Sequence, residues 1–334
     1  MANLTLVKSK HLHPFAAVLC QHGSKVRRLL KKAKLPLSCL DDPEAFIPDV
    51  RLGDFRELVA QETGFPNISL EATRHLEFEH LGDFGRALGM EPTLRGALNK
   101  FSRLVVTETS NVIIELHLQP NGDLWFSHRV LSQAESGEWH NDLYRIIWML
   151  KIVRLVDPAW SPAEILINAN ATQERFEAIE MLGSTARFQQ TATGFLVPAS
   201  MLALPVRKNS AQEGDIGVDL WSTVPAQTYA GSIKQIIHSY ATDDWLSIDQ
   251  FSEVADISVR TIQRRLSTEQ KSWSNLIQQC RAEMAADLLE KTDATIADIA
   301  SQLGYGNQGN FTRAFYRWAK VSPSEFRKQR SHLH

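Results

Sequence analysis

The sequence predicts an α+β N-terminal domain followed by an all-α C-terminal domain with two helix-turn-helix motifs joined by a long helix. Two observations lead to this prediction. A pattern of roughly twenty residues occurs twice near the C-terminus, and strand signals alternate with helical signals between residues 104 and 198. The length of 334 residues is enough for two domains, and a hydrophobic fraction of 43% is ample for globular cores.

The N-terminal part mixes helices with short strands, as in an α+β domain. Residues 1–13 are polar and are expected to fray. Asn121-Gly122 predicts a hairpin turn between two alternating runs, and residues 187–198 predict a second hairpin. The expected helices span residues 15–33 (interrupted at Gly23), 50–63, 92–104, 141–155 and 173–182, and the expected strands span residues 105–107, 112–118, 124–130 and 164–168.

The repeated pattern spans residues 247–266 and, in its second copy, residues 295–316. In each copy a short apolar-periodic helix leads through a tight turn into a second helix, which is the sequence form of a helix-turn-helix. Ser247 and Thr295 are N-cap residue types, and each stands just before the periodic residues begin. Asp298, three residues after Thr295, suits the positive end of the helix dipole.

The turns of the two copies differ in composition. The second turn reads Leu303-Gly304-Tyr305-Gly306, and its glycines can adopt the left-handed conformation that a tight turn needs. The first turn has no glycine, so Asp256 is expected to adopt this conformation there, although Asp tolerates it less well. One extra residue also enters the second copy after the turn begins.

A helix is expected between the two copies, over residues 274–290, where apolar residues recur at helical spacing. A helix of this length spans about 25 Å, so it can hold two recognition helices about one DNA turn, ~34 Å, apart. After the second copy, Ser322, Pro323 and Glu325 have the types and spacing of an N-cap, a first-turn proline and a capping box. A last short helix is therefore expected.

The second helix of each copy has polar and basic residues on the face opposite its apolar residues. The residues expected to point inward are Val259, Ile262 and Leu266 in the first copy, and Phe311 and Phe315 in the second. Arg can bind guanine, Gln and Asn can bind adenine, and Thr can contact a thymine methyl group or a phosphate. The candidate DNA-binding residues are therefore Arg260, Thr261, Gln263 and Arg264 in the first copy, and Gln308, Asn310, Thr312 and Arg313 in the second. The alternative is that both faces are merely solvated, but Arg264 and Arg313 stand at equivalent positions of two copies in register.

The doubled motif and three short runs resemble the AraC/XylS family of bacterial transcription regulators. The runs are Ile299–Tyr305, Phe311–Phe315 (FTRAF) and Ser322–Arg327 (SPSEFR). The resemblance covers about residues 231–330 and implies two recognition helices in adjacent major grooves of double-stranded DNA, with RNA polymerase as a further partner. Carried over by position, its base-reading candidates are Arg260, Thr261, Arg264, Gln308, Asn310 and Arg313. Ser252 stands where the family usually has Ala, and Gly306 where it often has Ser.

Residues 81–98 (LGDFGRALGMEPTLRGAL), with the hairpin and long helix after them, resemble the N-terminal effector-binding domain of AraC-type regulators of the OruR-like group. The resemblance implies that this domain senses a small-molecule effector and contributes to a homodimer. His117, His128 and Trp148 could line a pocket, although each is more readily explained as structural or exposed. The expected boundaries are 14–206 for the effector-binding and dimerisation domain, 207–231 for a linker and 232–330 for the DNA-binding domain.

Composition limits the possible partners and compartments. The net charge is −2, but the chain from Arg260 onward has 12 basic and 7 acidic residues, a local charge of +5 that favours salt-sensitive DNA binding. The three cysteines have no CxxC spacing, which favours a reducing cytoplasm. His11 and His13 have no third ligand in view, so neither a metal nor another cofactor is expected. Residues 146–156 are too short and too charged to span a membrane.

Two other classes of protein compete with a regulator. An enzyme, or a protein-interaction domain, could be tethered to DNA by the C-terminal module, but there is no GxSxG nucleophile elbow and no cysteine in a reactive setting. A structural nucleoid protein would be more basic and would not need base-specific side chains. The sequence favours a non-enzymatic, effector-responsive transcription activator, although the residues alone do not separate an activator from a repressor.

Overall fold

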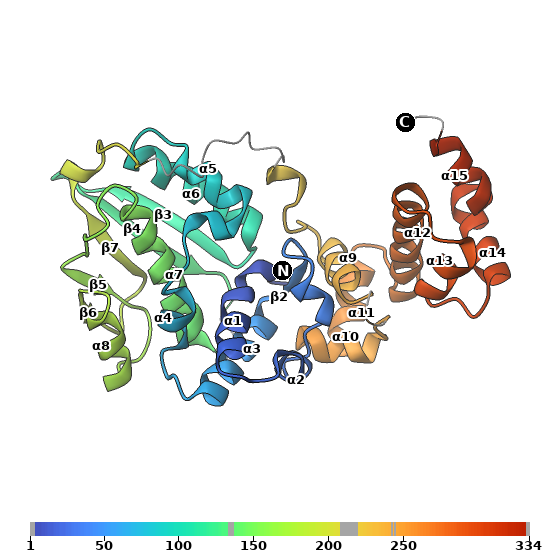
Figure 1. Ribbon diagram of the computed structural model, residues 1–334, viewed down its shortest axis with the longest axis horizontal. Coiled ribbons are helices and arrows are strands. Elements are labelled where there is room, and N and C mark those ends of the chain that lie inside the picture. Colours follow the sequence, from blue (N-terminus) through green and yellow to red (C-terminus); the bar gives the residue numbers. More distant parts are fainter. Residues whose placement is uncertain (1–3, 133–136, 208–219, 242, 244, 332–334) are drawn as a thin grey trace. The chain divides into compact units, whose positions relative to one another are not determined.

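The chain divides into two structural units near residue 225. The computed structural model describes residues 4–132, 137–207, 220–241, 243 and 245–331. One unit is formed by Thr5–Pro225, and the other by the chain from Ala226 onward together with Leu4 (Figure 1). Residues 208–219 of the linker expected at residues 207–231 lie outside the described residues.

The N-terminal unit is a mixture of helices and strands, as the sequence predicts (Figure 1). Its helices are α1 (His13–Gln21), α2 (Val26–Lys32), α3 (Asp49–Thr63), α4 (Ile68–Thr73), α5 (Asp83–Gly89), α6 (Leu94–Glu108), α7 (Glu138–Val153) and α8 (Gln173–Glu180). Its strands are β1 (Leu6–Lys8), β2 (Phe46–Pro48), β3 (Val112–Leu118), β4 (Leu124–Val130), β5 (Glu164–Leu166), β6 (Thr185–Arg187) and β7 (Thr193–Val197). The break between α1 and α2 contains Gly23, and α3 ends at Gly64 in a left-handed conformation, φ +73°.

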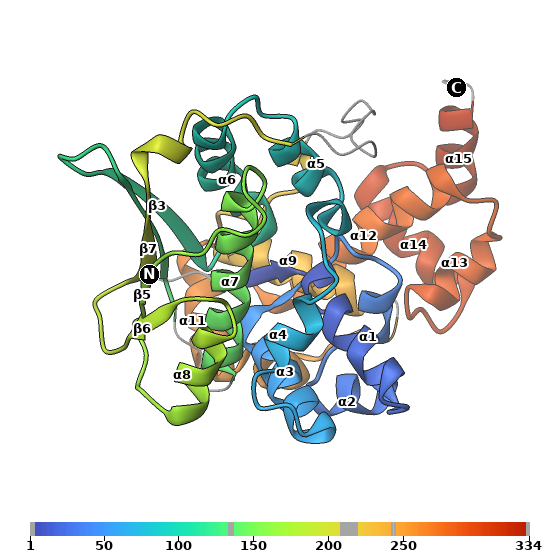
Figure 2. The ribbon, with the colours of Figure 1, turned by 60° about the vertical axis from the view of Figure 1, so that its left-hand side comes forward.

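A five-stranded sheet with the strand order β3-β4-β7-β5-β6 forms the body of this unit. β3 and β4 form the hairpin expected around Asn121-Gly122, and Gly122 has φ +87°. Figure 2 shows α6 and α7 on the same side of the sheet. The ring of Phe126 on β4 lies 5.5 Å from that of Phe195 on β7 and 6.1 Å from that of Phe101 on α6. The inward face of the sheet and α6 therefore share one apolar core.

The prediction that residues 1–13 fray is wrong from Leu6 onward. β1 pairs with β2, and a short 3-10 helix (Ser9–His11) follows it. Lys8 is fully buried, and its Nζ lies 3.4 Å from Oε1 of Glu108 on α6. The polar residues that suggested a frayed end are held by carboxylates distant in sequence, which local polarity cannot reveal.

Two strand predictions are also wrong. Residues 105–107 continue α6, which Thr93 caps. Their burial follows a helix, because Leu104, Val105, Thr107 and Glu108 are buried whereas Val106 is 43% exposed. Residues 187–198 do not form a hairpin, because β6 pairs in parallel with β5, whereas β7 pairs antiparallel with β4 and β5. The turn residues between β6 and β7 indicate a reversal of the chain but not the strand with which it then pairs.

The C-terminal unit consists of helices throughout its described residues (Figure 1). These are α9 (Tyr229–Tyr240), α10 (Ile248–Ala255), α11 (Val259–Thr268), α12 (Trp273–Lys291), α13 (Ile296–Gln302), α14 (Gln308–Ala319) and α15 (Pro323–Ser331). The long helix and the last short helix are confirmed, and Ser322 and Glu325 form the reciprocal hydrogen bonds of a capping box. α9 begins at Tyr229, within the stretch expected to be linker, because the side chain of Thr228 caps it.

Candidate nucleic-acid interface

The first helix-turn-helix consists of α10 and α11, with Phe251 and Ile262 fully buried between them. Ser247 caps α10, and Gln250 completes a capping box with it. Asp256 adopts the left-handed conformation predicted for the turn, with φ +55°. The turn allows α11 to cross α10 and leaves one side of α11 exposed.

The exposed side of α11 carries the four candidates of the first copy. Arg260, Gln263 and Arg264 are exposed, whereas Thr261 is half-buried. The Thr261 hydroxyl accepts a hydrogen bond from Ser258 Oγ at 3.0 Å, and its backbone N–H donates to the same oxygen. Thr261 thus forms part of the cap of α11. In the described part of the chain, the guanidinium groups of Arg260 and Arg264 have neither a hydrogen bond nor an ion pair, so both charges face solvent unpaired.

The second helix-turn-helix consists of α13 and α14. Thr295 caps α13 by accepting from the Asp298 N–H, and Gly304 has φ +73° in the turn. The neighbouring glycine of the turn, Gly306, is not left-handed. Phe311 and Phe315 of α14 are buried as predicted, with ring centroids 5.8 Å apart. One side of α14 is therefore fixed against α13, and the other is exposed.

The exposed side of α14 carries the candidates of the second copy. Gln308, Asn310 and Arg313 are exposed, and Thr312 is half-buried. Arg313 Nη2 donates a hydrogen bond to Asn310 Oδ1 at 2.6 Å, so the arginine is oriented by its neighbour one turn earlier. Asn307 caps the helix by accepting from the Asn310 N–H at 2.8 Å.

Sequence reasoning missed two exposed residues of α14, Tyr316 and Arg317. Tyr316 is 55% exposed, and both residues line a surface hollow together with Asn310 and Arg313. They lie three and four residues after Arg313, so the helical period alone places them beside it. A phenol and a guanidinium there extend the candidate interface with groups that suit phosphate oxygens.

Arg281, near the middle of α12, contacts aromatic residues of both motifs. The Arg281 guanidinium lies 4.8 Å from the ring centroid of Trp245, which precedes α10, and 5.4 Å from that of Tyr305, which precedes α14. Cation–π contacts of this kind contribute ~0.5–2 kcal/mol each. Beyond α12, Arg327 of α15 donates to the Ala294 carbonyl at 2.7 Å. The long helix therefore links the turn of the second motif to the start of the first.

The remaining sequence candidates lie in the N-terminal unit. His11 is buried and hydrogen-bonded inside the unit, and burial lowers its pKa. The described residues contain no group of three or more His, Cys, Asp or Glu that could hold a metal. His128 is buried with Nε2 3.0 Å from Asp142 Oδ1, His117 is exposed, and Trp148 lines an apolar cavity. Of the three pocket candidates, His117 is the one that faces solvent.

Comparisons with known proteins find two matching families and several relatives. A helix-turn-helix domain family matches residues 251–329, and the family of the arabinose-binding N-terminal domain of AraC transcription regulators matches residues 23–206. An uncharacterized HTH-type transcriptional regulator of Mycobacterium tuberculosis is 24% identical over 335 residues, covering 95% of this chain and 96% of that protein. The ornithine utilization regulator of Pseudomonas aeruginosa is 28% identical over 85 residues, which is 25% of each chain. The crystal structure of the regulator CdpR from Pseudomonas aeruginosa is 17% identical, covers 96% of this chain and 98% of its own, and has a TM-score of 0.45.

These matches favour a transcription regulator over an enzyme tethered to DNA. Both matching families and the relatives are transcription regulators, so the tethered-enzyme alternative is not supported. Across the described residues, no helix has the length and apolar composition needed to cross a membrane. The predicted fold class, with its α+β N-terminal domain and helical DNA-binding domain, is confirmed. Because the N-terminal family matches more than half of the chain, from residue 23 to residue 206, the chain belongs to the AraC family of transcription regulators.

Proposed function

We propose that this regulator recognises a specific DNA sequence by placing α11 and α14 in adjacent major grooves, and that it activates transcription. The observation that supports the proposal best is the equivalence of the two exposed faces. Arg264 and Arg313 occupy corresponding positions in the two copies, and both are exposed. Solvated helix faces have no need of base-reading groups at matching positions, whereas two grooves of one duplex present the same geometry twice.

The side chains divide into base readers and positioning contacts. Arg264 and Arg313 are proposed to bind guanine, and Gln263, Gln308 and Asn310 to bind adenine or phosphate. Arg260 is proposed to contact a base edge or a phosphate near the start of α11. The half-buried Thr261 and Thr312 are proposed to contact a thymine methyl group or a backbone phosphate. These roles require no cofactor.

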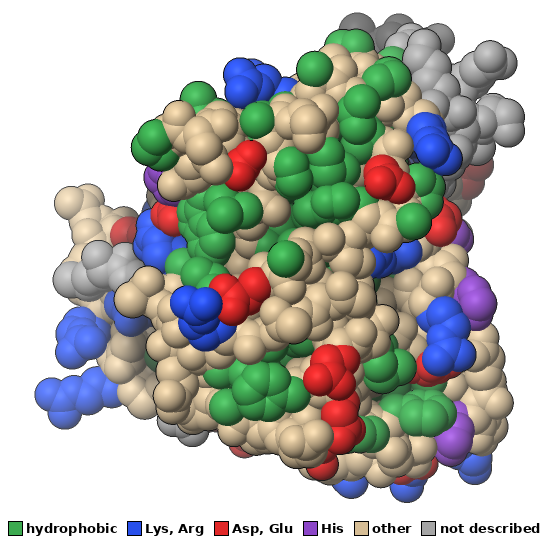
Figure 3. All heavy atoms as spheres, turned by 90° about the vertical axis from the view of Figure 1, so that its left-hand side faces the viewer, with side chains coloured by type: hydrophobic (Ala, Val, Ile, Leu, Met, Phe, Trp, Pro, Cys, Tyr) green, Lys and Arg blue, Asp and Glu red, His purple; other side chains and the backbone are tan. Residues whose placement is uncertain are grey.

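A single subunit would bind DNA with modest affinity, because the chain from Arg260 onward has an excess of only five positive charges. We propose a homodimer, in which the second DNA-binding domain benefits from a high effective concentration. On the face of the N-terminal unit seen in Figure 3, hydrophobic side chains gather between charged ones. Exposed apolar residues of this unit include Leu118, Met181 and Leu196, at 60%, 69% and 46% exposure. Such surface supports the N-terminal unit as the dimerisation module.

The N-terminal unit is proposed to bind a small-molecule effector and thereby change how the C-terminal unit engages DNA and RNA polymerase in the cytoplasm. Such coupling requires the effector to bind two conformations with different affinities. The proposed boundaries are 14–206 for the effector-binding domain, 207–231 for the linker and 232–330 for the DNA-binding domain. The match of the N-terminal family to residues 23–206 supports an effector-binding role for this part of the chain.

The experiment that tests the proposal compares affinities for a DNA site selected from a random library and for unrelated DNA. Arg264→Ala and Arg313→Ala should each cost about 1–3 kcal/mol on the selected site, and each should relax preference at one base pair. Lys291→Ala is the control, because Lys291 is an exposed cation of α12 paired with Asp287. If both arginine variants weaken binding equally on every sequence, they are phosphate contacts, and recognition by these helices is wrong.

A further inference from the structure

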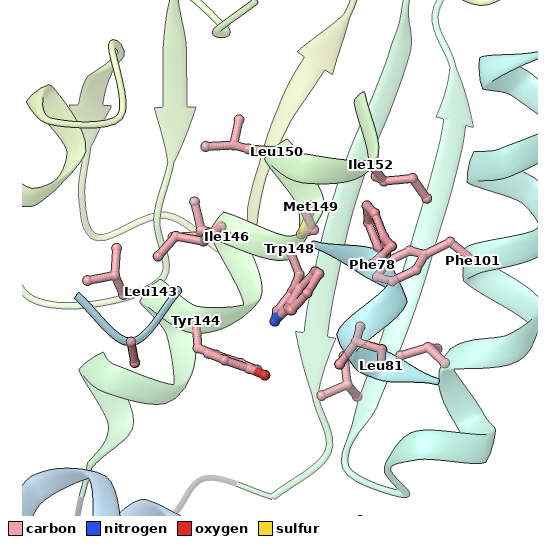
Figure 4. Close-up of a cluster of buried hydrophobic side chains, with 14 of the residues drawn as sticks. Phe78, Leu81, Phe101, Leu143, Tyr144, Ile146, Trp148, Met149, Leu150 and Ile152 are labelled. Atoms are coloured by element: carbon pink, nitrogen blue, oxygen red, sulfur yellow. The ribbon is translucent and has the colours of Figure 1, made fainter. Parts of the chain in front are cut away.

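The N-terminal unit contains an apolar cavity of about 80 Å³. Its wall comes mainly from α3, α6, α7 and β3, and its apolar members include Leu52, Phe101, Val105, Ile114, Trp148 and Met149. Figure 4 shows Tyr144 and Trp148 of α7 on the side of the helix where Leu81 and Phe101 lie. One water molecule needs ~10–15 Å³ on this measure, so the cavity has room for a short aliphatic body of a few carbons.

One wall of this cavity carries a buried cation, Arg56 of α3, which is 3% exposed. Its guanidinium donates to Asn141 Oδ1 and, at 3.4 Å, to the His11 carbonyl, while its Nε–H has no hydrogen-bond partner in the described part of the chain. The rings of Phe15 and Tyr144 lie against it, with centroids 4.8 and 4.4 Å from Cζ. A buried hydrogen-bond donor without a partner destabilises the folded protein by ~1–3 kcal/mol, so the presence of Arg56 at this position needs an explanation.

Arg56 differs from the other buried cations of this unit. Lys8 and Lys10 each lie within 3.4 Å of an oxygen of Glu108. Even Arg145, which is half-buried, lies 3.4 Å from an oxygen of Asp142. Among the described residues, no carboxylate oxygen lies within 4.0 Å of the Arg56 guanidinium. The unit therefore pairs its other buried cations and leaves this one without a carboxylate at the edge of an apolar cavity.

The charge of Arg56 persists under physiological conditions. Burial lowers the pKa of the guanidinium to about 10, which still leaves it protonated at neutral pH. The neighbouring Tyr144 hydroxyl stays protonated too, because burial raises its pKa to about 12. The Trp148 indole N–H lies near that hydroxyl but makes no hydrogen bond of normal geometry. Arg56, Tyr144 and Trp148 all line the cavity, as does Glu108, whose carboxylate is paired with Lys8 and Lys10.

Two charged residues of the cavity wall also line a second space. Asp49 and Arg145 border the apolar cavity and also a polar hollow of about 220 Å³ whose wall includes His128, Asn111 and Thr193. Arg145 Nη2 lies 3.9 Å from Asp49 Oδ2. The apolar cavity and the polar hollow therefore adjoin at this pair.

We propose that this cavity binds a small monocarboxylic acid with an aliphatic body, and that Arg56 is its carboxylate receptor. A planar guanidinium suits a carboxylate, and a charge-assisted hydrogen bond would supply the partner that Arg56 Nε–H lacks. The aliphatic body, of about three to five carbons, lies against Leu52, Val105 and Met149. This inference rests on the proposed function, because it names the chemical class of the effector.

The test is a thermal-shift and calorimetric titration of the full-length protein with straight and branched acids from propanoate to hexanoate. Each acid is compared with its amide, which has nearly the same shape but no charge. At least one acid should raise Tm and bind ten-fold or more tightly than its amide. Equal binding of acid and amide, or no binding of any acid in the series, overturns the proposal without the need for a variant.

Three substitutions locate the site. Arg56→Met should abolish binding of the acid, and Arg56→Lys should weaken it while keeping the charge. Arg51→Met on the same helix is the matched control, because Arg51 does not line the cavity, and it should leave binding unchanged. Full acid binding by a folded Arg56→Met protein also overturns the proposal. DNA affinity of the ligand-free protein is measured in parallel, so failure of the acid series is distinguishable from failure of the proposed regulator function.

Discussion

The two helix-turn-helix motifs follow one plan but are stabilised by different chemistry. In the first motif the turn depends on Asp256, and a polar contact anchors the motif to α9: the Glu269 carboxylate accepts from the backbone N–H groups of Tyr229 and Ala230 at 2.8 and 2.9 Å. In the second motif the turn depends on Gly304, and aromatic rings form the core. The two motifs thus present corresponding exposed arginines, although the contacts that support the motifs differ.

The comparison indicates that DNA recognition fixes the positions of the exposed residues, whereas stability can be achieved by different supporting contacts. Side chains that contact bases must face the DNA groove from the same helix positions, and Arg264 and Arg313 occupy equivalent positions in the two copies. A helix N-terminus can be anchored by a carboxylate, and a short helix can equally be anchored by packed rings. We therefore expect the first motif to respond mainly to changes of charge and the second mainly to changes of shape.

The largest effect should come from Phe315→Ala. Its ring lies 5.6 Å from that of Trp318 and 5.4 Å from that of Phe326, so the substitution should destabilise the second motif by about 3–5 kcal/mol. Leu266→Ala at the corresponding position of the first motif should cost less, about 2–3 kcal/mol. Hydrogen exchange of the α13 and α14 amides reports the change locally. Equal acceleration in α10 and α11 would show that the aromatic core does not distinguish the motifs.

A smaller effect, of opposite sign in the two motifs, is expected at the turns. Gly304→Ala should destabilise the second motif by ~1–2 kcal/mol, because φ is +73° and a Cβ would lie 3.2 Å from Trp245 Cδ1. Asp256→Gly should leave the first motif unchanged or stabilise it by up to about 0.5 kcal/mol, since glycine adopts a φ of +55° without strain. Thermal unfolding of the full-length variants measures both. A loss of stability in Asp256→Gly would contradict the claim that Asp256 is strained.

The smallest effect is expected in the coupling between neighbouring DNA-contacting side chains. Asn310 orients Arg313 through a 2.6 Å hydrogen bond, whereas Arg264 has no such neighbour. In a double-mutant cycle of DNA affinity, Asn310→Ala and Arg313→Ala should be non-additive by about 0.5–1 kcal/mol. Gln263→Ala and Arg264→Ala should add within ~0.3–0.5 kcal/mol. Additivity in both pairs would mean that the hydrogen bond does not persist on DNA.

The C-terminal unit was predictable because its signals are local. Caps at Ser247, Thr295 and Ser322 stand next to the helices they begin, and apolar spacing alone gives the buried faces of α11 and α14. The sequence-based predictions were wrong where contacts between residues distant in sequence determine the structure. The run at 105–107 has strand composition, but helical packing against the core keeps it in α6.

The cavity in the N-terminal unit could not be predicted in the same way. Arg56 has its partners on η1 (Ser9–His11) and α7, distant along the chain, and its lack of a carboxylate is visible only once those elements are assembled. Sequence reasoning chose His117, His128 and Trp148 by residue type, and Trp148 alone of these lines the apolar cavity. Local patterns reveal capping and periodicity, but they do not reveal a missing ion-pair partner.

The most direct test of the central claim is selection of bound sequences from random DNA by the wild-type protein, Arg264→Ala and Arg313→Ala. If α11 and α14 occupy adjacent major grooves, each variant should lose preference at its own base pair, and the two base pairs should lie about 10 bp apart, one turn of DNA. Loss of preference at the same base pair, or at no base pair in either variant, would contradict recognition by two equivalent helices.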